Sequence, residues 1–180
     1  FNEINQQNEQ ADNDIQKYIK DRNLTMQKTA DGMYYSIDSK ASTKKSASVS
    51  DLIKFHYKMT LLDGTLIDST NRVLNQVKAE VWGTKATVFS LPLSNMKEGE
   101  SGIFILPASL AFGGSSFGNV PAYATIRLDI TITSIRTESE QIDDMKTLYM
   151  MQGAEQTTSG MLFKKLVEKP AAAQVLIGQN

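Results

Sequence analysis

The feature that most constrains the fold is a pair of β-prone runs joined by an Asp-Gly dipeptide. Residues 51–70 read DLIKFHYKMTLLDGTLIDST, with Asp63 and Gly64 between the two runs. Asp-Gly flanked by alternating apolar residues is among the strongest short-range hairpin signals, because the tight turn needs residues that tolerate positive φ. The sequence therefore predicts an antiparallel β-hairpin.

Two further strands and one short helix follow this hairpin. Residues 103–106 form a continuous apolar run of strand length, and residues 125–135 alternate apolar with polar side chains. Pro92 suits the first turn of a helix over about 91–96, which Gly99 helps to end. Several strands with turn-rich links around one short helix predict an antiparallel α+β domain.

A short amphipathic helix is expected before this domain. Ile15, Tyr18 and Ile19 have the i, i+3, i+4 spacing of one helix face, which predicts a helix over about 13–23. The Asn- and Gln-rich residues 1–13 have little to bury and are expected to be frayed. Beyond the helix, an Ala-Asp-Gly turn signal precedes a β-prone run at 33–37.

The region from Ser39 to Ser48 is dominated by Ser and Lys, which predicts a polar, mobile connection.

The helix-turn-strand unit has an echo near the C-terminal end. A second helical stretch over about 140–151 precedes Gly160-Met161-Leu162-Phe163, as the first helix precedes Gly32-Met33-Tyr34-Tyr35. We interpret the two stretches as a repeated unit, whose second copy would lead into another β domain outside these residues. Chance similarity between two short helix-turn-strand units is the alternative.

Composition argues against several classes of function. Nineteen Lys and Arg against twenty Asp and Glu give a net charge of −1, without the basic run that nucleic acid or an anionic membrane would attract. One His and no Cys argue against disulfides, thiolate nucleophiles and the usual zinc sites, so we expect no metal or cofactor. No apolar run approaches the ~20 residues that a transmembrane helix needs.

Four ordered blocks resemble the FKBP family of peptidyl-prolyl cis-trans isomerases. The blocks are FHYKMTLLDGTLIDST (55–70), MKEGE (96–100), ILPASLAFGG (105–114) and NVPAYATIRLDITI (119–132). The resemblance implies an FKBP-like α+β fold, in which an antiparallel sheet wraps around one short helix. It also implies three parts: an N-terminal helix and strand extension (1–50), the isomerase domain (51–137) and a C-terminal helix-strand extension (138–180).

The helix-strand prefix resembles envelope lipoproteins of Bacteroidetes-type bacteria that carry such domains. Because the chain begins at Phe1 and not at Met, we expect an upstream segment to have been removed. The resemblance implies a location in the cell envelope, in the periplasm or on an outer-membrane lipoprotein, with a lipid anchor upstream as one candidate.

The same resemblance implies a set of site residues. Catalytic positions would be Tyr57, Asp68, Phe89 and Phe112, and substrate-binding positions Ile67, Ala86 (through a nearby backbone N–H), Val120 and Leu128. Ile67 and Leu128 stand where the family usually has Phe, Phe89 where it has Trp, and Phe112 where it has Tyr. The pocket thus stays apolar but changes shape, which predicts weaker substrate and macrolide-inhibitor binding.

The residues also allow less specific readings. His56 lies next to Tyr57 on a strand and should point to the opposite face, and Asp68 could be only a turn carboxylate. The Gly-rich segment 113–118 lacks the Lys-Ser or Lys-Thr ending of a phosphate loop and is interpreted as a flap.

The leading functional hypothesis is isomerisation of X–Pro bonds in proline-containing clients, and it needs no cofactor. One alternative is a client-binding or chaperone module of weak or no activity. Another is an assembly role, with self-association through the faces of Tyr18 or Met150.

Overall fold

The computed structural model describes residues 2–164, with side chains from residue 6 onward. Residues up to Glu138 form one compact unit, and the described residues from Ser139 onward belong to a second. The elements of the first unit are α1 (Asn2–Asp21), β1 (Gln27–Lys28), β2 (Tyr34–Asp38), β3 (Leu52–Leu61), β4 (Leu66–Ser69), β5 (Lys78–Val81), α2 (Ser90–Ser94), β6 (Ser101–Leu106) and β7 (Ile126–Arg136). The second holds α3, which begins at its boundary (Glu138–Met151), β8 (Glu155–Gln156) and β9 (Leu162–Phe163).

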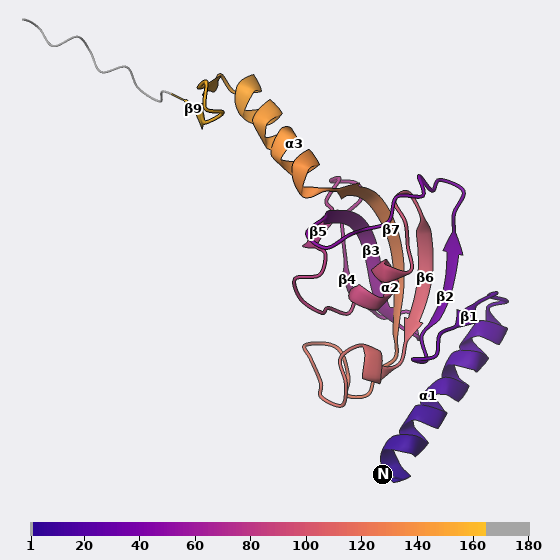
Figure 1. The fold of residues 1–180 in the computed structure, drawn as a ribbon. Coiled ribbons are helices and arrows are strands. Elements are labelled where there is room, and N and C mark those ends of the chain that lie inside the picture. The colour runs from indigo at the N-terminus through magenta and orange to yellow at the C-terminus, as the bar shows by residue number, and fades with distance from the viewer. Residues whose placement is uncertain (1, 165–180) are drawn as a thin grey trace, which may run out of the picture. The chain divides into compact units, whose positions relative to one another are not determined.

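All seven strands of the first unit form one antiparallel sheet (Figure 1). The order is β1-β2-β6-β7-β3-β4, and β5 also pairs with β3. The hairpin predicted around Asp63 is confirmed as β3 and β4, and the runs at 103–106 and 125–135 are confirmed as β6 and β7. The α+β fold with one sheet around a short helix is therefore confirmed.

The main core lies between the inner face of the sheet and α2. Alternation along β7 turns Ile126, Leu128, Ile130 and Ile132 inward, and all four are buried. β3 contributes Ile53, Phe55, Tyr57 and Met59, and α2 contributes Leu93. Strand alternation of this kind sends successive side chains to opposite faces, so one face fills the core.

The outer face of the sheet is covered by α1, whose predicted apolar stripe is confirmed. Ile15 and Tyr18 are buried against Tyr34 of β2 and Ile105 of β6. The Tyr18 hydroxyl also accepts a 2.8 Å hydrogen bond from Arg127 of β7. Tyr18 therefore packs within its own chain, and the predicted self-association through its face is wrong because that face is already covered.

The prediction that residues 1–13 are frayed is wrong. The helix begins at Asn2, well before the expected start. Part of the expected frayed region is tied to the sheet at Asp12, whose carboxylate accepts hydrogen bonds from Lys28 (2.6 Å) and the Tyr34 hydroxyl (2.9 Å). These contacts come from residues far along the chain, so local composition did not reveal them.

The Ser- and Lys-rich connection is held in place and is not the mobile segment that was expected. The Thr43 N–H donates to the Glu98 carbonyl, and the Glu98 N–H donates to the Lys45 carbonyl, both at 2.9 Å. Ser39 also donates a 2.8 Å hydrogen bond to the buried Glu100 carboxylate. The segment is therefore fixed to the turn that enters β6.

The short strand β5 was not predicted. Its residues Lys78–Val81 pair with Leu52–Phe55 of β3. The division into 1–50, 51–137 and 138–180 stays a prediction, although β2, which it assigns to the first part, pairs along its length with β6.

Glu98 should make the stability of this region depend on pH. Its carboxylate accepts the Ile135 N–H at 2.9 Å and the Thr43 hydroxyl at 2.8 Å, and these hydrogen bonds lower its pKa below the usual 4.5. A carboxyl with a lowered folded-state pKa stabilises the fold above its unfolded pKa and loses that contribution as pH falls through the folded value. Urea unfolding should thus show a free energy that declines below about pH 4.5, and Glu98→Gln should flatten this decline. An unchanged slope in Glu98→Gln would contradict the assignment.

Candidate functional site

The candidate site is built on the inner face of β3. Phe55, Tyr57 and Met59 are buried on that face, whereas His56 lies on the other face, only partly buried, as predicted. The Tyr57 main chain is fixed to Thr70: the Tyr57 N–H donates to the Thr70 hydroxyl at 3.1 Å, and the Thr70 N–H donates to the Tyr57 carbonyl at 3.0 Å. The strand pairing thus sets the direction of the Tyr57 ring.

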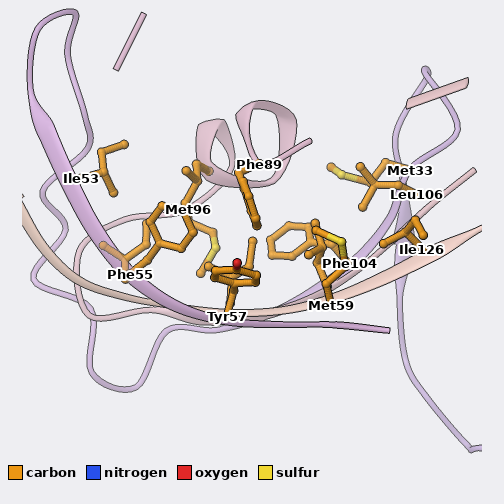
Figure 2. Close-up of a cluster of buried hydrophobic side chains, with 14 of the residues drawn as sticks. Met33, Ile53, Phe55, Tyr57, Met59, Phe89, Met96, Phe104, Leu106 and Ile126 are labelled. Carbon is orange, nitrogen blue, oxygen red and sulfur yellow. The ribbon is translucent and has the colours of Figure 1, made fainter. Parts of the chain in front are cut away.

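Phe89 reaches the same place from the N-terminal end of α2. Its ring centroid lies 4.8 Å from that of Tyr57 in an edge-to-face arrangement, and 5.2 Å from that of Phe55. Figure 2 shows the Phe89 side chain descending from α2 toward Tyr57. Such tilted pairs are favourable beyond their buried area, so the three rings form a preformed aromatic cluster.

Asp68, on β4, is exposed and meets this cluster through the Tyr57 side chain. The hydroxyl of the buried Tyr57 donates a hydrogen bond to the exposed Asp68 carboxylate, which also accepts the Ser69 N–H at 2.8 Å. Burial, together with the hydrogen bond to Asp68, raises the pKa of the Tyr57 phenol. Tyr57 therefore stays protonated and acts as a donor, and the carboxylate does more than accept local turn N–H groups.

Three of the predicted substrate-binding positions contribute to the apolar surroundings at different depths. Ile67 is half-buried and packs against the core cluster, and Val120 is buried within it. Leu128 has no exposed surface, so it packs within the core cluster and is not accessible to solvent.

Phe112 lies on the loop that follows β6, half-buried against the core cluster. Its ring stacks on Phe117 with centroids 5.6 Å apart and planes within 6°. Phe117 in turn exchanges two main-chain hydrogen bonds with Val120, of 3.0 and 2.9 Å. The segment interpreted as a flap is thus a closed turn that carries an exposed aromatic side chain.

Ala86 lies on the loop between β5 and α2. It is exposed and lines a shallow depression with Trp82, Lys85 and Ser90, among others. Its loop continues along the chain into Phe89, three residues later. A contact with substrate through the N–H near Ala86 remains a prediction.

Sequence reasoning missed three contributors to the site. Phe55 could have been found, because it lies two residues from Tyr57 and so shares its strand face. Thr70 and Phe117 carried no usable signal, since their roles depend on strand register and on the path of a loop. Metal ligation has no support in residues 2–164, where no group of three or more His, Cys, Asp or Glu side chains could hold an ion.

The arrangement offers a packed aromatic cluster with one phenol-carboxylate pair at its exposed side. Within the described part of the chain, no helix is long and apolar enough to cross a membrane. The site has the composition of a small apolar binding site, in which a few polar groups orient the bound molecule.

Replacement of Asp68 by Asn should lower the pKa of Tyr57. The carboxylate stabilises the protonated phenol through its hydrogen bond and its charge, whereas burial of the ring would persist. Alkaline titration followed by ultraviolet absorbance should therefore show one tyrosine ionising at lower pH in Asp68→Asn. Asp63→Asn, at the exposed hairpin turn, is the matched control and should leave the tyrosine titration unchanged. Identical curves for Asp68→Asn and the native chain would refute the coupling.

Comparison with known families decides the classification. Residues 43–133 match the family model for FKBP-type peptidyl-prolyl cis-trans isomerases. The chain belongs to this family. The matched residues of this FKBP domain begin at Thr43, in the Ser- and Lys-rich connection, and end within β7. They include every predicted site residue.

Two curated relatives carry isomerase names. The FKBP domain and its flanks are 30% identical over 125 residues to the FKBP-type isomerase FkpA of Aeromonas hydrophila, covering 66% of this chain and 43% of that protein. Human FKBP9 is 29% identical over 103 residues, covering 56% of this chain and 18% of FKBP9. The chain thus spans less than half the length of either relative.

The crystal structure of FkpA from Escherichia coli has the same fold. It superposes with a TM-score of 0.57 at 19% identity, covering 74% of this chain and 64% of that one. The likeness supports the FKBP-like fold.

Proposed function

We propose that this FKBP domain is a peptidyl-prolyl cis-trans isomerase that acts on X–Pro bonds of folding polypeptides. The observation that carries the proposal is the buried cluster of Phe89, Tyr57 and Phe55 with Asp68 at its rim. Membership of the family and the isomerase names of its relatives support it.

Prolyl isomerisation suits a site without acid–base machinery. Rotation about the X–Pro amide has a barrier of roughly 18–20 kcal/mol, because twisting the bond breaks its resonance. The planar amide has more charge separation than the twisted one, so an apolar wall that excludes water disfavours the ground state relative to the transition state. Phe89 and Tyr57 would supply that wall.

Tyr57 and Asp68 would orient the site in this mechanism. The phenol remains a hydrogen-bond donor because its pKa is raised by burial and by Asp68. The Asp68 carboxylate holds the hydroxyl at the rim, where polar groups of the peptide would remain hydrated. No proton transfer is needed in this scheme, and neither is a cofactor.

A second candidate function is client binding with little or no catalysis. It is favoured by Phe117, whose ring is 68% exposed and stacks on Phe112, the position that lacks the family's phenol. An exposed aromatic ring beside an apolar site can hold unfolded segments without catalysing rotation of their X–Pro bonds. Holding of this kind would leave the isomerisation rate of a short peptide unchanged.

Two assays separate the candidates. The isomerase assay follows cis-to-trans conversion of an Xaa-Pro peptide, and the holding assay follows suppression of aggregation of a proline-free client. Phe112→Tyr restores the phenol and should raise kcat/KM about fivefold, which corresponds to roughly 1 kcal/mol for one hydrogen bond. Phe117→Ser should weaken holding more than it lowers peptide turnover, because Phe117 acts on the predicted catalytic residues only through its stacking on Phe112. Holding without turnover in all variants would favour the second candidate.

We propose the cell envelope as the location, on the resemblance of the helix-strand prefix to envelope lipoproteins. Fractionation of source cells should recover the protein with the envelope or periplasm. Labelling with a radioactive fatty acid would test the lipid anchor, and recovery in the cytosol without label would refute both.

A further inference from the structure

The second unit repeats the local structure with which the first unit begins. In the first, α1 leads through a short link into the β1–β2 hairpin, and in the second α3 leads into the β8–β9 hairpin (Figure 1). The repeat extends to individual hydrogen bonds, as the two helix ends and the two hairpin turns show.

The two helices end in the same way. After α1, Arg22, Asn23 and Leu24 donate main-chain hydrogen bonds to Tyr18, Lys20 and Ile19, and after α3, Gln152, Gly153 and Ala154 donate to Leu148, Met150 and Tyr149. The second residue beyond each helix has a positive φ, of 51° at Asn23 and 80° at Gly153. This geometry is a left-handed helix cap, and it aligns position 23 with position 153.

The two hairpin turns also correspond. The Thr29 N–H donates to the Met33 carbonyl and the Thr157 N–H to that of Met161, both at 2.9 Å. In return, the Met33 N–H donates to the Thr29 hydroxyl at 3.1 Å, and the Met161 N–H to the Thr157 hydroxyl at 3.0 Å. Chance resemblance between two short sequences does not predict this agreement of turn and cap together.

The two helix faces carry apolar side chains at matching positions but differ in how far these are covered. By the cap alignment, Ile15, Tyr18 and Ile19 of α1 correspond to Met145, Leu148 and Tyr149 of α3. Ile15 and Tyr18 are 1% and 8% exposed, whereas Met145 and Leu148 are 55% and 54% exposed. The α3 unit therefore carries the same apolar stripe without a surface beneath it.

The hairpins repeat this contrast. Met33, at the end of the first turn, has no exposed surface, whereas its counterpart Met161 is 63% exposed. Asp12 and the Tyr34 hydroxyl, which are hydrogen-bonded between α1 and β2, correspond to Ile142 and Leu162. A polar pair has thus been replaced by an apolar pair at both positions together, as expected if α3 and β9 were to meet as α1 and β2 do.

We propose that α3, β8 and β9 form the docking unit of a second FKBP-like β domain, which follows β9 in the same polypeptide. β9 would pair with a strand of that domain, as β2 pairs with β6 of the first sheet at Tyr34–Ile105 and Tyr35–Phe104. The Met145–Leu148 stripe would cover the outer face of that sheet. This inference does not depend on the proposed catalysis.

The first unit supports this occupant over a second copy of the same chain. Its outer sheet face, at Tyr34 and Ile105, is already covered by Ile15 and Tyr18. A second copy would have to release its own α1 before it could accept α3. In addition, Leu148 lacks the hydroxyl with which Tyr18 meets Arg127, so the surface under α3 should be apolar at that place.

A graft within the full 180-residue chain tests whether the α3 unit fits an FKBP-like sheet. Residues 142–163 replace residues 12–35, and hydrogen exchange is followed by NMR, which resolves the grafted copy from the C-terminal one. In the graft, the amides of Leu162 and Phe163 should exchange about 100-fold more slowly than at the C-terminal end, because sheet pairing protects them. The same graft carrying Leu148→Asp is the matched control and should lose this protection.

A milder graft guards against simple failure to fold. It transfers only residues 142–154 in place of 12–24 and keeps the native hairpin, so the sheet retains its edge strand. In this variant, the amides of residues 142–154 are compared between the grafted and the C-terminal copy. If both copies exchange at the same rate while the β6 amides remain protected, the α3 unit does not fit an FKBP-like sheet.

Two further outcomes concern the identity of the occupant. Sedimentation of the 180-residue chain should show a monomer, and a dimer dissociated by Leu148→Asp would assign the face to a second copy instead. The polypeptide isolated from source cells should carry a further β domain C-terminal to Asn180, and a natural chain that ends there would overturn the proposal.

Discussion

Phe89→Ala should lower the free energy of unfolding by about 3–5 kcal/mol, the usual cost of truncating a buried aromatic side chain. The ring is 5% exposed and contacts both Tyr57 and Phe55. Alanine would leave a cavity between α2 and β3 that the sheet cannot close. Urea unfolding with a shared m-value measures the change directly.

Phe89→Leu separates the loss of packing from the loss of the aromatic wall. Leucine keeps most of the volume, so stability should change by less than about 1.5 kcal/mol. Isomerase turnover should nevertheless fall, because the flat ring facing Tyr57 is lost. A Phe89→Ala variant within about 1 kcal/mol of native would show that the cluster is not a tightly packed part of the core.

Gly99→Ala should destabilise the fold on the order of 4 kcal/mol, through backbone strain and steric overlap. Gly99 has φ of +82°, and a Cβ there would collide with the Ala41 carbonyl oxygen. That carbonyl belongs to the connection held by Glu98 and cannot move without breaking the hydrogen bonds of Thr43 and Lys45.

Gly64→Ala is the matched control for this prediction. Its φ of +94° is equally unfavourable for a side chain, but no atom lies within 4 Å of the added Cβ. Only the cost of the left-handed conformation should remain, about 1–2 kcal/mol. Equal losses in the two variants, measured by chemical unfolding, would mean that the connection yields to the collision.

The sheet could be predicted because its strongest signals are local. Asp63-Gly64 specifies a turn by its own conformational preference, and the alternation along β7 marks an inner face whatever lies opposite. The strand β5 could not be found this way. Its four residues gain their structure from pairing with β3, and its burial alternates only weakly.

The N-terminal helix shows where local reasoning fails. Its apolar stripe was visible at Ile15 and Tyr18, but the hydrogen bonds of Asp12 to Lys28 and Tyr34, which tie the helix to the sheet, were not. These are tertiary contacts, and composition suggested disorder there. The repeat near the C-terminal end was visible in sequence as Gly-Met followed by two apolar residues, but its hydrogen bonds required the structure.

Part of the candidate site could be predicted and part could not. Tyr57, Asp68 and Phe89 lie together, as the family resemblance predicted. These positions could be predicted because they lie on, or next to, strands and a helix whose register the family pattern fixes. Phe112 was expected in the pocket, yet its stacking on Phe117 depends on a loop path that no pattern encodes. The place of Ala86 could not be predicted either, because it also depends on the path of a loop.

The most direct test of the central claim is the cis-to-trans rate of short Xaa-Pro peptides with the purified chain. We predict acceleration proportional to protein concentration, lost in an Asp68→Ala, Phe89→Leu double variant whose circular dichroism spectrum matches the native one. The absence of acceleration for any Xaa, with a natively folded protein, would contradict catalysis and leave client binding as the function of this FKBP domain.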